Sequence, residues 1–279
     1  MKYINIDFCG KIHTNYQELI CEFKYFGCGE VEFHIKEDIE NEEITIFQSF
    51  NVGKFNDDLM KLWVCCDVLK RNNVKSIKYF APFLPYTRQD RSGDATRSVG
   101  SKILATIIKD CKIKEVITYD VHVEQIDGVF DCKVGHLSAI PLFLENIKQN
   151  YDISKSVILF PDTGSATRFK DYFRDADVNI AIVRKTRLNN GDVKTQLLGN
   201  VKDKDVIIID DMIDGGRTVV GAMQHSLELG AKNVYVYATH GIFSGNGIEL
   251  LNNSQIKKIT ITNSIKNDNL PSKFEVIEL

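Results

Sequence analysis

The stretch VIIIDDMIDGGRT, residues 206–218, is the part of the sequence that best indicates a fold. Its apolar run is typical of a parallel strand buried on both faces. The two glycines after the acids permit a tight turn with positive φ, and Thr218 is placed to cap a following helix. The stretch therefore predicts a strand, a turn and a helix, with Asp210 and Asp211 delivered to the carboxyl end of the strand.

The rest of the chain repeats this alternation of short β-branched runs and longer amphipathic segments. Asn56 is placed to cap the helix that follows it, and Gly230 stands where the glycine after a helix belongs. Such alternation predicts βαβ units with parallel sheets, which bind ligands at the carboxyl ends of their strands. The polar connection 144–156 suggests two domains, 1–145 and 146–279. The predicted strands are 43–50, 76–83, 115–121, 156–162, 179–185, 205–211 and 233–241.

Composition excludes several classes of protein. Lys and Arg total 35 against 38 Asp and Glu, which argues against a protein that binds nucleic acid through bulk charge. The seven cysteines are an odd number without a CxxC pair, as expected for reduced thiols in a cytoplasm. The first residues lack the apolar core of a secretory signal, and no apolar run is long enough to cross a membrane. We therefore expect a cytoplasmic protein without nucleic-acid or membrane partners.

The residues of 206–218 also indicate a ligand. A glycine turn that leads into a helix presents backbone N–H groups to a phosphate, and adjacent carboxylates suit the neighbouring hydroxyls of a ribose. The alternative is an ordinary strand, turn and helix whose acids lie in a solvated loop. The agreement of acid pair, glycine turn and helix favours a sugar-phosphate site made by Asp210, Asp211, Asp214, Gly215, Gly216, Arg217 and Thr218.

The stretch resembles the phosphoribosyl-binding loop of type I phosphoribosyltransferases and of ribose-phosphate diphosphokinases. Further motifs distinguish the two families. These motifs resemble those of the diphosphokinases, and they occur in that family's order over almost the whole chain. On this likeness the protein is identified as a member of the ribose-phosphate diphosphokinase family. The motifs are FKYFGCGEVEFHI (23–35), FLPYTRQDRSGD (83–94), YDVHVEQIDGVF (119–130), LFPDTGSATRF (159–169) and RKTRLNNGDV (184–193).

The resemblance implies a role for a residue of each motif. The diphosphate in transfer would meet Lys185 and Arg187 on a catalytic loop, although a polar hairpin turning at Asn-Asn-Gly is the plainer interpretation of that segment. Magnesium would be held by His122 and Asp162; a lone histidine is more often structural, and magnesium prefers oxygen ligands. Without the resemblance, the arginines of 83–94 would be a solvated charge cluster. ATP would be bound by Phe26, Glu30, Arg88, Gln89 and Asp94.

The resemblance also implies a fold and a reaction. The fold is α/β, with two type I phosphoribosyltransferase-like domains, each a mostly parallel sheet flanked by helices. The N-terminal domain serves ATP and the C-terminal domain the sugar phosphate. The β,γ-diphosphate of ATP moves to the anomeric hydroxyl of ribose 5-phosphate, giving phosphoribosyl pyrophosphate and AMP, with Mg²⁺ as cofactor. The family is homo-oligomeric, and a neighbouring subunit supplies the adenine-contacting loop.

This sequence departs from the family in the loop that holds the sugar 5-phosphate. Where the family has Asp-Thr, a small residue, Gly and Thr, this chain has Asp214, Gly215, Gly216, Arg217 and Thr218. Either Arg217 points outward and backbone N–H groups bind the phosphate, or the smaller residue and the added cation admit a diphosphate ester. ADP-ribose is such an ester, and its 1-diphosphate would serve NAD salvage. The family pattern favours ribose 5-phosphate.

Two further departures and two rival functions follow from the same motifs. Cys28 stands where the family has Asn or Asp near the adenine, and the final residues KFEVIEL lack the family's last helix. Control by phosphate and ADP is therefore not carried over.

A non-catalytic regulatory homologue would be expected to lose the metal and catalytic-loop residues, which are all present. A phosphoribosyltransferase would share the loop at 206–218, but neither the motif at 83–94 nor two domains.

Overall fold

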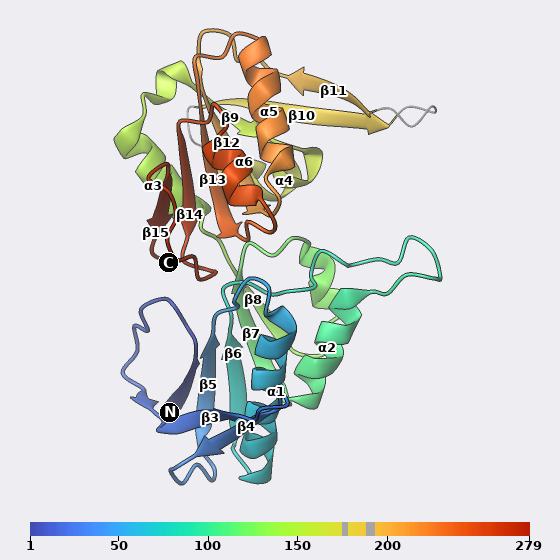
Figure 1. Ribbon diagram of the computed structural model, residues 1–279, viewed down its shortest axis with the longest axis vertical. Helices are drawn as coiled ribbons and strands as arrows, with labels where there is room; N and C mark the ends of the chain where they lie inside the picture. Colours follow the sequence, from blue (N-terminus) through green and yellow to red (C-terminus); the bar gives the residue numbers. More distant parts are fainter. Residues whose placement is uncertain (175–177, 188–192) are drawn as a thin grey trace. The chain divides into compact units, whose positions relative to one another are not determined.

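The computed structural model describes the backbone of residues 1–174, 178–187 and 193–279, and the side chains of that part except those of 124 and 185–194. The chain forms two compact units (Figure 1). The first unit is Met1–Leu137 with Ser264–Lys266, and the second is Ser138–Asn263 with Asn267–Leu279. In the described part of the chain, no helix is both long and apolar enough to cross a membrane.

The first unit is built on a six-stranded parallel sheet in the order β2-β1-β5-β6-β7-β8. An antiparallel hairpin of β3 and β4 stands apart from this sheet. The bounds are β1 (Lys2–Ile6), β2 (Gln17–Glu18), β3 (Cys21–Tyr25), β4 (Val31–Ile35), β5 (Glu43–Gln48), α1 (Phe55–Arg71), β6 (Ser76–Phe80), α2 (Gly100–Asp110), β7 (Ile113–Tyr119), the 3-10 turn η1 (Glu124–Gly128) and β8 (Lys133–Leu137).

The second unit has a seven-stranded sheet in the order β11-β10-β9-β12-β13-β14-β15, parallel except for the β10–β11 pair. The bounds are α3 (Ile140–Asn150), η2 (Ile153–Lys155), β9 (Ser156–Phe160), α4 (Thr163–Phe169), η3 (Lys170–Phe173), β10 (Asn179–Arg187), β11 (Val193–Leu198), β12 (Asp205–Ile213), α5 (Arg217–Glu228), β13 (Asn233–Gly241), α6 (Gly247–Asn252), β14 (Lys258–Thr262) and β15 (Phe274–Ile277).

The central strands of the second unit explain the apolar runs in the sequence. Every residue of β9 is buried, and so is every residue of β12 after Asp205. A strand covered by helices on both faces has no solvent side, so it reads as a continuous apolar run. Each fully buried Ile or Val side chain contributes roughly 1.5–3 kcal/mol to folding.

In each sheet, the order of strands reverses at one point. The strand β9 has β10, which follows it, on one side and β12 on the other, and β1 lies likewise between β2 and β5. Because crossovers between parallel strands are right-handed, the connections that leave such a junction cover opposite faces of the sheet. The carboxyl ends at the reversal then border a crevice, which is where open α/β sheets bind ligands. The topology thus points to the β9–β12 junction and the β1–β5 junction.

All the predicted strands are present, with ends that differ by a few residues, and β13 has the predicted bounds. Gly230 follows α5 with a φ of 88°, as predicted. The two predicted helix caps are wrong. Asn56 lies inside the first turn of α1, whose cap position is Lys54, and Thr218 lies inside α5, whose cap position is Gly216. Neither helix has a side-chain cap, because each follows directly from a tight turn.

The division at 145/146 falls inside α3, whereas the compact units divide between Leu137 and Ser138. The helix belongs to the second unit because its residues pack and bond there. Phe143 lies edge-on to Tyr237 of β13, and the hydroxyl of Tyr237 donates to Oδ1 of Asn146 at 2.6 Å. The polar segment 144–156 that suggested a linker comprises the end of α3, the turn η2 and the first residue of β9.

Candidate active site

The acid pair lies at the β9–β12 junction of the second unit. Asp210 and Asp211 are the sixth and seventh residues of β12 and are 7% and 1% exposed. They are therefore part of the buried strand and do not lie in a solvated loop. Burying a carboxylate costs free energy unless it is paired or hydrogen-bonded, so the neighbours of this pair determine its chemistry.

These neighbours come from α4, which begins directly after β9. Asp162 is the N-cap of α4, and its Oδ1 accepts the backbone N–H of Ser165 at 2.8 Å. The hydroxyl of Ser165 donates to Oδ1 of Asp210 at 2.6 Å, and a guanidinium nitrogen of Arg168 donates to Oδ1 of Asp211. That nitrogen lies 3.9 Å from Oδ1 of Asp210. Among the described residues, the junction therefore holds three carboxylates and the half-buried guanidinium of Arg168.

The electrostatics of the pair are unequal. Burial raises the pKa of Asp210 well above its ordinary value, and the charge of Asp211 raises it further, whereas the hydrogen bond from Ser165 lowers it. Asp211 receives the guanidinium of Arg168, whose side chain is 14% exposed. A cation held against two adjacent carboxylates reduces the repulsion between them. The arrangement keeps two acids side by side at a place where a polyhydroxyl ligand can reach them.

The loop after β12 is shaped by close backbone contacts. Gly216 has a φ of 76°, and a Cβ there would lie 3.0 Å from Cγ of Leu251 on α6. A Cβ on Gly247, the first residue of α6, would lie 2.9 Å from the carbonyl oxygen of Asp214. The hydroxyl of Ser244 donates to the Asp214 carboxylate. Glycine at 216 and 247 therefore lets α6 press against the loop and hold its turn.

This turn leads into the N-terminus of α5. The first hydrogen bond of the helix runs from the N–H of Val220 to the carbonyl of Gly216, so the preceding N–H groups have no partner within the helix. Such groups, with the helix dipole, favour an anion. Arg217 and Thr218 are exposed, and a Cβ on Gly215 would meet no atom within 4 Å. Of the two glycines predicted to have positive φ, Gly216 does and Gly215 does not.

The residues predicted to bind ATP lie on two segments of the first unit. Phe26 and Glu30 close the β3–β4 hairpin, where the Phe26 N–H donates to the Glu30 carbonyl at 2.9 Å. Arg88 and Gln89 are exposed on the segment before α2. The carbonyl of Gln89 accepts the N–H of Ser101, and a Cβ on Gly100 would lie 2.8 Å from Gln89 Oε1.

Asp94 has a local structural role. Its carboxylate accepts from the hydroxyl and the N–H of Thr96, which lowers its pKa, and it pairs with Arg97 at 3.1 Å. The turn 94–97 is therefore organised by Asp94 itself. A role in binding ATP stays a prediction for this residue.

The two predicted metal ligands belong to different units. His122 follows β7 in the first unit and is half-buried, and Asp162 caps α4 in the second. In the described part of the chain, no three His, Cys, Asp or Glu residues are grouped as a metal site would require. Asp162 uses one carboxylate oxygen for its cap. Mg²⁺ is commonly bound through one or two carboxylates together with substrate phosphates, which fits Asp162 better than His122.

Lys185 and Arg187 fall at the end of β10. The backbone of Lys185 is opposite Thr195 of β11, and that of Arg187 is opposite Val193. Their side chains and the connection 188–192 lie outside the described residues. The antiparallel β10–β11 pair agrees with the hairpin interpretation of this segment and leaves the catalytic role of both residues a prediction.

Sequence reasoning missed Ser165 and Arg168, although both lie in a motif that it singled out. The signal was spacing: Asp162, Ser165 and Arg168 recur every third residue, which places them on one face at the start of α4. What the sequence did not contain was the partner of that face. It became visible only with the pairing of β9 and β12.

Comparison with known proteins gives one consistent result. Residues 7–111 match the family model described as the N-terminal domain of ribose phosphate pyrophosphokinase, and residues 165–278 match the phosphoribosyl synthetase-associated domain. Ribose-phosphate pyrophosphokinases from Agrobacterium fabrum and Thermotoga maritima are each 32% identical over 270 residues. These matches cover 93% and 96% of this chain and 87% and 85% of the relatives.

A solved structure agrees over the whole chain. The crystal structure of phosphoribosylpyrophosphate synthetase from Mycobacterium smegmatis is 27% identical and superposes with a TM-score of 0.88. The match covers 99% of this chain and 94% of that one. The predicted fold, α/β with two phosphoribosyltransferase-like domains, is therefore confirmed.

Proposed function

Because the chain belongs to the ribose-phosphate pyrophosphokinase family, we propose that it transfers the β,γ-diphosphate of ATP to the anomeric hydroxyl of ribose 5-phosphate and releases AMP. The observation that carries this proposal is the β9–β12 junction. There a buried acid pair, a glycine turn and the N-terminus of α5 occur together. These are the groups that a ribose carrying a 5-phosphate requires.

Different residues of the junction would bind different parts of the sugar phosphate. The 5-phosphate accepts hydrogen bonds from the first N–H groups of α5, and the ring hydroxyls donate to Asp210 and Asp211. Arg168 and Ser165 hold the acid pair in place, so these carboxylates need no rearrangement when the sugar binds. A sugar fixed in this way presents its anomeric hydroxyl for in-line attack on the β-phosphorus, which is the positioning that phosphoryl transfer demands.

The remaining groups serve ATP and its charge. Mg²⁺, held by Asp162 with His122 as the weaker ligand, would neutralise phosphate oxygens when bound. Phe26, Glu30, Arg88, Gln89 and Asp94 would bind the nucleotide, and Lys185 and Arg187 would face the diphosphate in transfer. The Phe26 ring, 41% exposed at the end of a hairpin, supports a homo-oligomer in which this hairpin completes the site of a neighbouring subunit.

A second acceptor, ADP-ribose, is favoured by the loop after β12. A Cβ on Gly215 would meet no atom within 4 Å, and the neighbouring Arg217 is exposed in the first turn of α5. A guanidinium can donate two hydrogen bonds to phosphate oxygens, so it would hold the additional phosphate of a diphosphate ester. The product would be the 1-diphosphate of ADP-ribose, a precursor suited to NAD salvage.

One experiment separates these proposals. The purified chain is incubated with ATP, Mg²⁺ and either sugar, and AMP release and product mass are measured. A product whose mass is that of ribose 5-phosphate plus one diphosphate group supports the first proposal. A product whose mass is that of ADP-ribose plus one diphosphate group supports the second. An Asp210→Asn variant purified in parallel controls for a contaminating host enzyme. If neither ribose 5-phosphate nor ADP-ribose leads to AMP release, at concentrations that saturate related enzymes, the result would instead support a non-catalytic regulatory homologue.

Metal dependence is tested in the same assay. Excess chelator should abolish turnover with either sugar, and added Mg²⁺ should restore it. Full activity in chelator would contradict the assignment of Asp162 and His122.

A further inference from the structure

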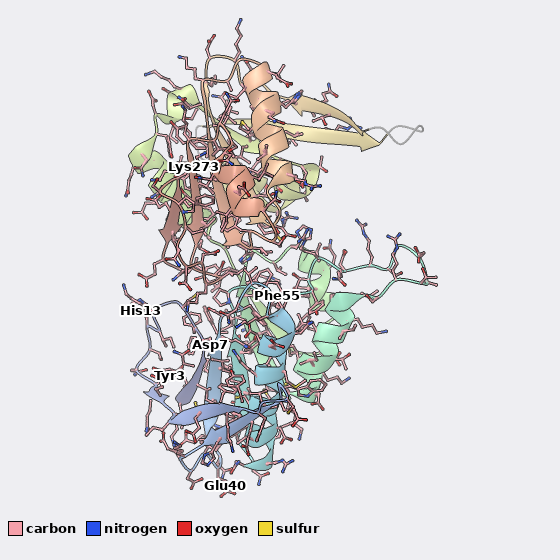
Figure 2. All side chains as sticks on the ribbon, in the orientation of Figure 1. Tyr3, Asp7, His13, Glu40, Phe55 and Lys273 are labelled. Atoms are coloured by element: carbon pink, nitrogen blue, oxygen red, sulfur yellow. The ribbon has the colours of Figure 1, made fainter. Side chains whose placement is uncertain are left out.

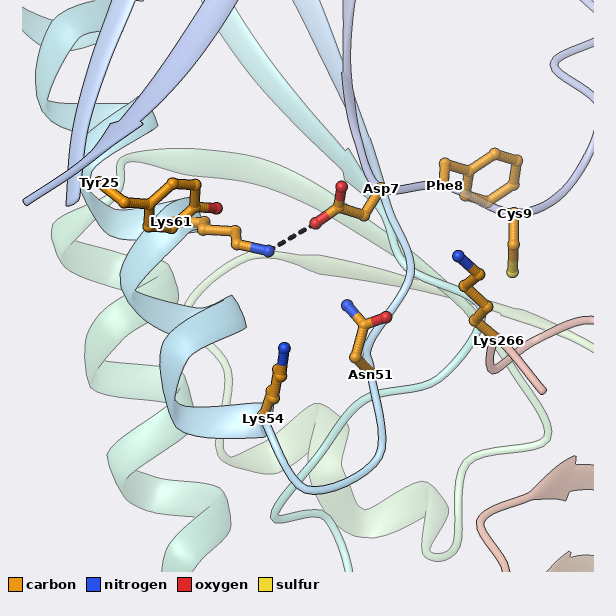
Figure 3. A pocket seen from close by; sticks show the side chains of 8 residues that line it. All are labelled: Asp7, Phe8, Cys9, Tyr25, Asn51, Lys54, Lys61 and Lys266. Carbon is orange, nitrogen blue, oxygen red and sulfur yellow. Dashed lines mark hydrogen bonds and ion pairs between the residues drawn. The ribbon is translucent and has the colours of Figure 1, made fainter. Parts of the chain in front are cut away.

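The first unit contains a cavity of about 420 Å³ that the proposed reaction does not use (Figure 3). It is lined by residues that follow β1 and β5, among them Asp7 and Asn51, so it lies at the strand-order reversal of the first sheet. Figure 2 shows Glu40 at one end of this unit and Phe55 toward the other, with Asp7 between them and nearer Phe55.

This cavity corresponds topologically to the sugar-phosphate site of the second unit. The strand β5 leads through residues 49–54 into α1, as β12 leads through 214–216 into α5. The strand β1 delivers Asp7 beside it, as β9 delivers Asp162. The end of β5, however, has Gln48 and Ser49 in place of the acid pair, and three lysines from other segments line the cavity: Lys54, Lys61 and Lys266.

Lys61 provides a buried cation in the wall. The residue is 9% exposed, and its ammonium donates to Asp7 at 2.5 Å and to Asp58 at 3.0 Å. Burial alone would lower the pKa of Lys61, but these two hydrogen bonds outweigh burial and raise it, so the ammonium stays charged. An ammonium has three N–H donors, and the third has no acceptor among the described residues.

The floor beneath Lys61 is rigid. Asp58 is fully buried and also accepts the backbone N–H of Asn51 at 2.7 Å, and the side-chain amide of Gln48 donates to its carbonyl at 2.8 Å. The hydroxyl of Tyr79 in turn donates to Gln48 at 2.7 Å. Buried polar groups that are all hydrogen-bonded hold one geometry, so the cation keeps its place in the absence of a ligand.

Two further ammonium groups border the same space. Lys54 and Lys266 are exposed and lie on either side of Asn51 in Figure 3, with Lys61 and Asp7 above them in this view. The lining carries three ammonium groups and the carboxylate of Asp7, and the carboxylate of Asp58 pairs with Lys61 from beneath, so positive charges outnumber negative ones by one in this cluster. The chain as a whole has a net charge of −3, so this excess of positive charge is local.

We propose that this cavity binds the phosphate group of a small phosphorylated metabolite, in contact with Lys54, Lys61 and Lys266 and with the side-chain amide of Asn51. The ammonium groups attract the negative charge of a phosphate monoester, and the amide adds a directed donor. The volume exceeds that of a phosphate ion, which leaves room for a sugar or nucleoside against Tyr25. The site is separate from the sugar-phosphate site of the second unit and does not depend on the proposed reaction.

The test is a calorimetric titration of the full chain with inorganic phosphate, repeated with ribose 5-phosphate and with AMP. The same titrations are followed by NMR. The backbone amide resonances of Asn51 and Phe55 report occupancy of this cavity, and those of Thr218 and Val219 report occupancy of the sugar-phosphate site in the second unit. We expect phosphate to shift both sets. The ligand that shifts Asn51 at the lowest concentration identifies whether the free ion, a sugar phosphate or a nucleotide is preferred.

The matched variants remove equal charge. The double variant Lys54→Ser, Lys266→Ser should raise the dissociation constant reported by Asn51 at least tenfold. It should leave the dissociation constant reported by Thr218 unchanged. The control, Lys75→Ser with Lys133→Ser, removes two exposed lysines of the same unit that pair with Glu43 and Glu115 outside the cavity. Two outcomes would overturn the proposal. One is an equal dissociation constant for the Lys54→Ser, Lys266→Ser variant and the control variant; the other is an Asn51 resonance that does not shift with any of the three ligands.

Discussion

The β9–β12 junction of the second unit and the β1–β5 junction of the first occupy equivalent places in two similar sheets, but they carry opposite charges. The second has three carboxylates around one guanidinium. The first has three ammonium groups around Asp7, with Asp58 buried beneath them. The reversal of strand order determines where a ligand can bind, because it opens the carboxyl ends of two strands. The side chains placed there determine which ligand binds: hydroxyl groups suit the acids, and phosphate suits the lysines.

The comparison is tested most severely by removing the guanidinium of Arg168 from the acidic junction. Arg168→Met should lower turnover at least 100-fold and destabilise the protein by about 3–5 kcal/mol, because it leaves Asp211 buried without its charge partner. Arg174→Met is the control, since that arginine pairs with Asp171 at the surface. Turnover and urea unfolding are measured for both. Normal turnover in Arg168→Met would show that the acid pair does not position the sugar.

The loop that enters α5 is tested by Arg217→Gly, which restores the usual family residue. A charge-assisted contact with phosphate is worth about 1.5–3 kcal/mol, or roughly a ten- to hundredfold change in kcat/KM. If Arg217 holds a diphosphate ester, the variant loses use of ADP-ribose more than use of ribose 5-phosphate. If it holds the 5-phosphate, ribose 5-phosphate suffers instead. Unchanged kinetics with both sugars would show that the arginine faces solvent and that backbone N–H groups alone bind the phosphate.

The two glycines of this loop form a matched pair of substitutions. Gly216→Ala should cost about 1–2 kcal/mol of stability, because an L-residue is strained at its positive φ and the new methyl group presses on Leu251. Gly215→Ala should be close to neutral, because a Cβ there would meet no atom within 4 Å and its φ is not positive. Thermal unfolding of the two variants tests this directly. Equal losses would mean that the turn is not held against α6.

The smallest expected effect is a dependence of stability on pH that belongs to the acidic junction alone. The folded pKa of Asp210 is raised by burial and by the charge of Asp211, so the folded state binds more protons than the unfolded state between the unfolded and folded pKa values. Stability should therefore fall as pH rises from about 4 through the folded pKa. Asp210→Asn should flatten this slope. The free energy of unfolding in urea is compared for both proteins at several pH values, and parallel slopes would contradict the shift.

The parts of the fold that could be predicted were those in which sequence and burial have the same period. The strands β9, β12 and β13 read as apolar runs because helices cover both faces of the sheet. The strands β3 and β4 were missed because their exposed hairpin alternates weakly and carries charges. The cap of α5 was misassigned because threonine is a common cap, while the chain used Gly216 at positive φ against Leu251. No local pattern reports a contact with α6.

By itself, the sequence determined the family, the two-domain α/β architecture and the acids and glycines of 206–218, since these depend on residue order and on short-range backbone preference. Tertiary structure alone decided that Arg168 and Ser165 hold the acid pair, and that Lys54, Lys61 and Lys266 border one cavity. Lys61 and Lys266 are 205 residues apart in the sequence (266 − 61). Only the packing of parallel strands, whose neighbours are set by crossovers and not by chain order, brings such residues together.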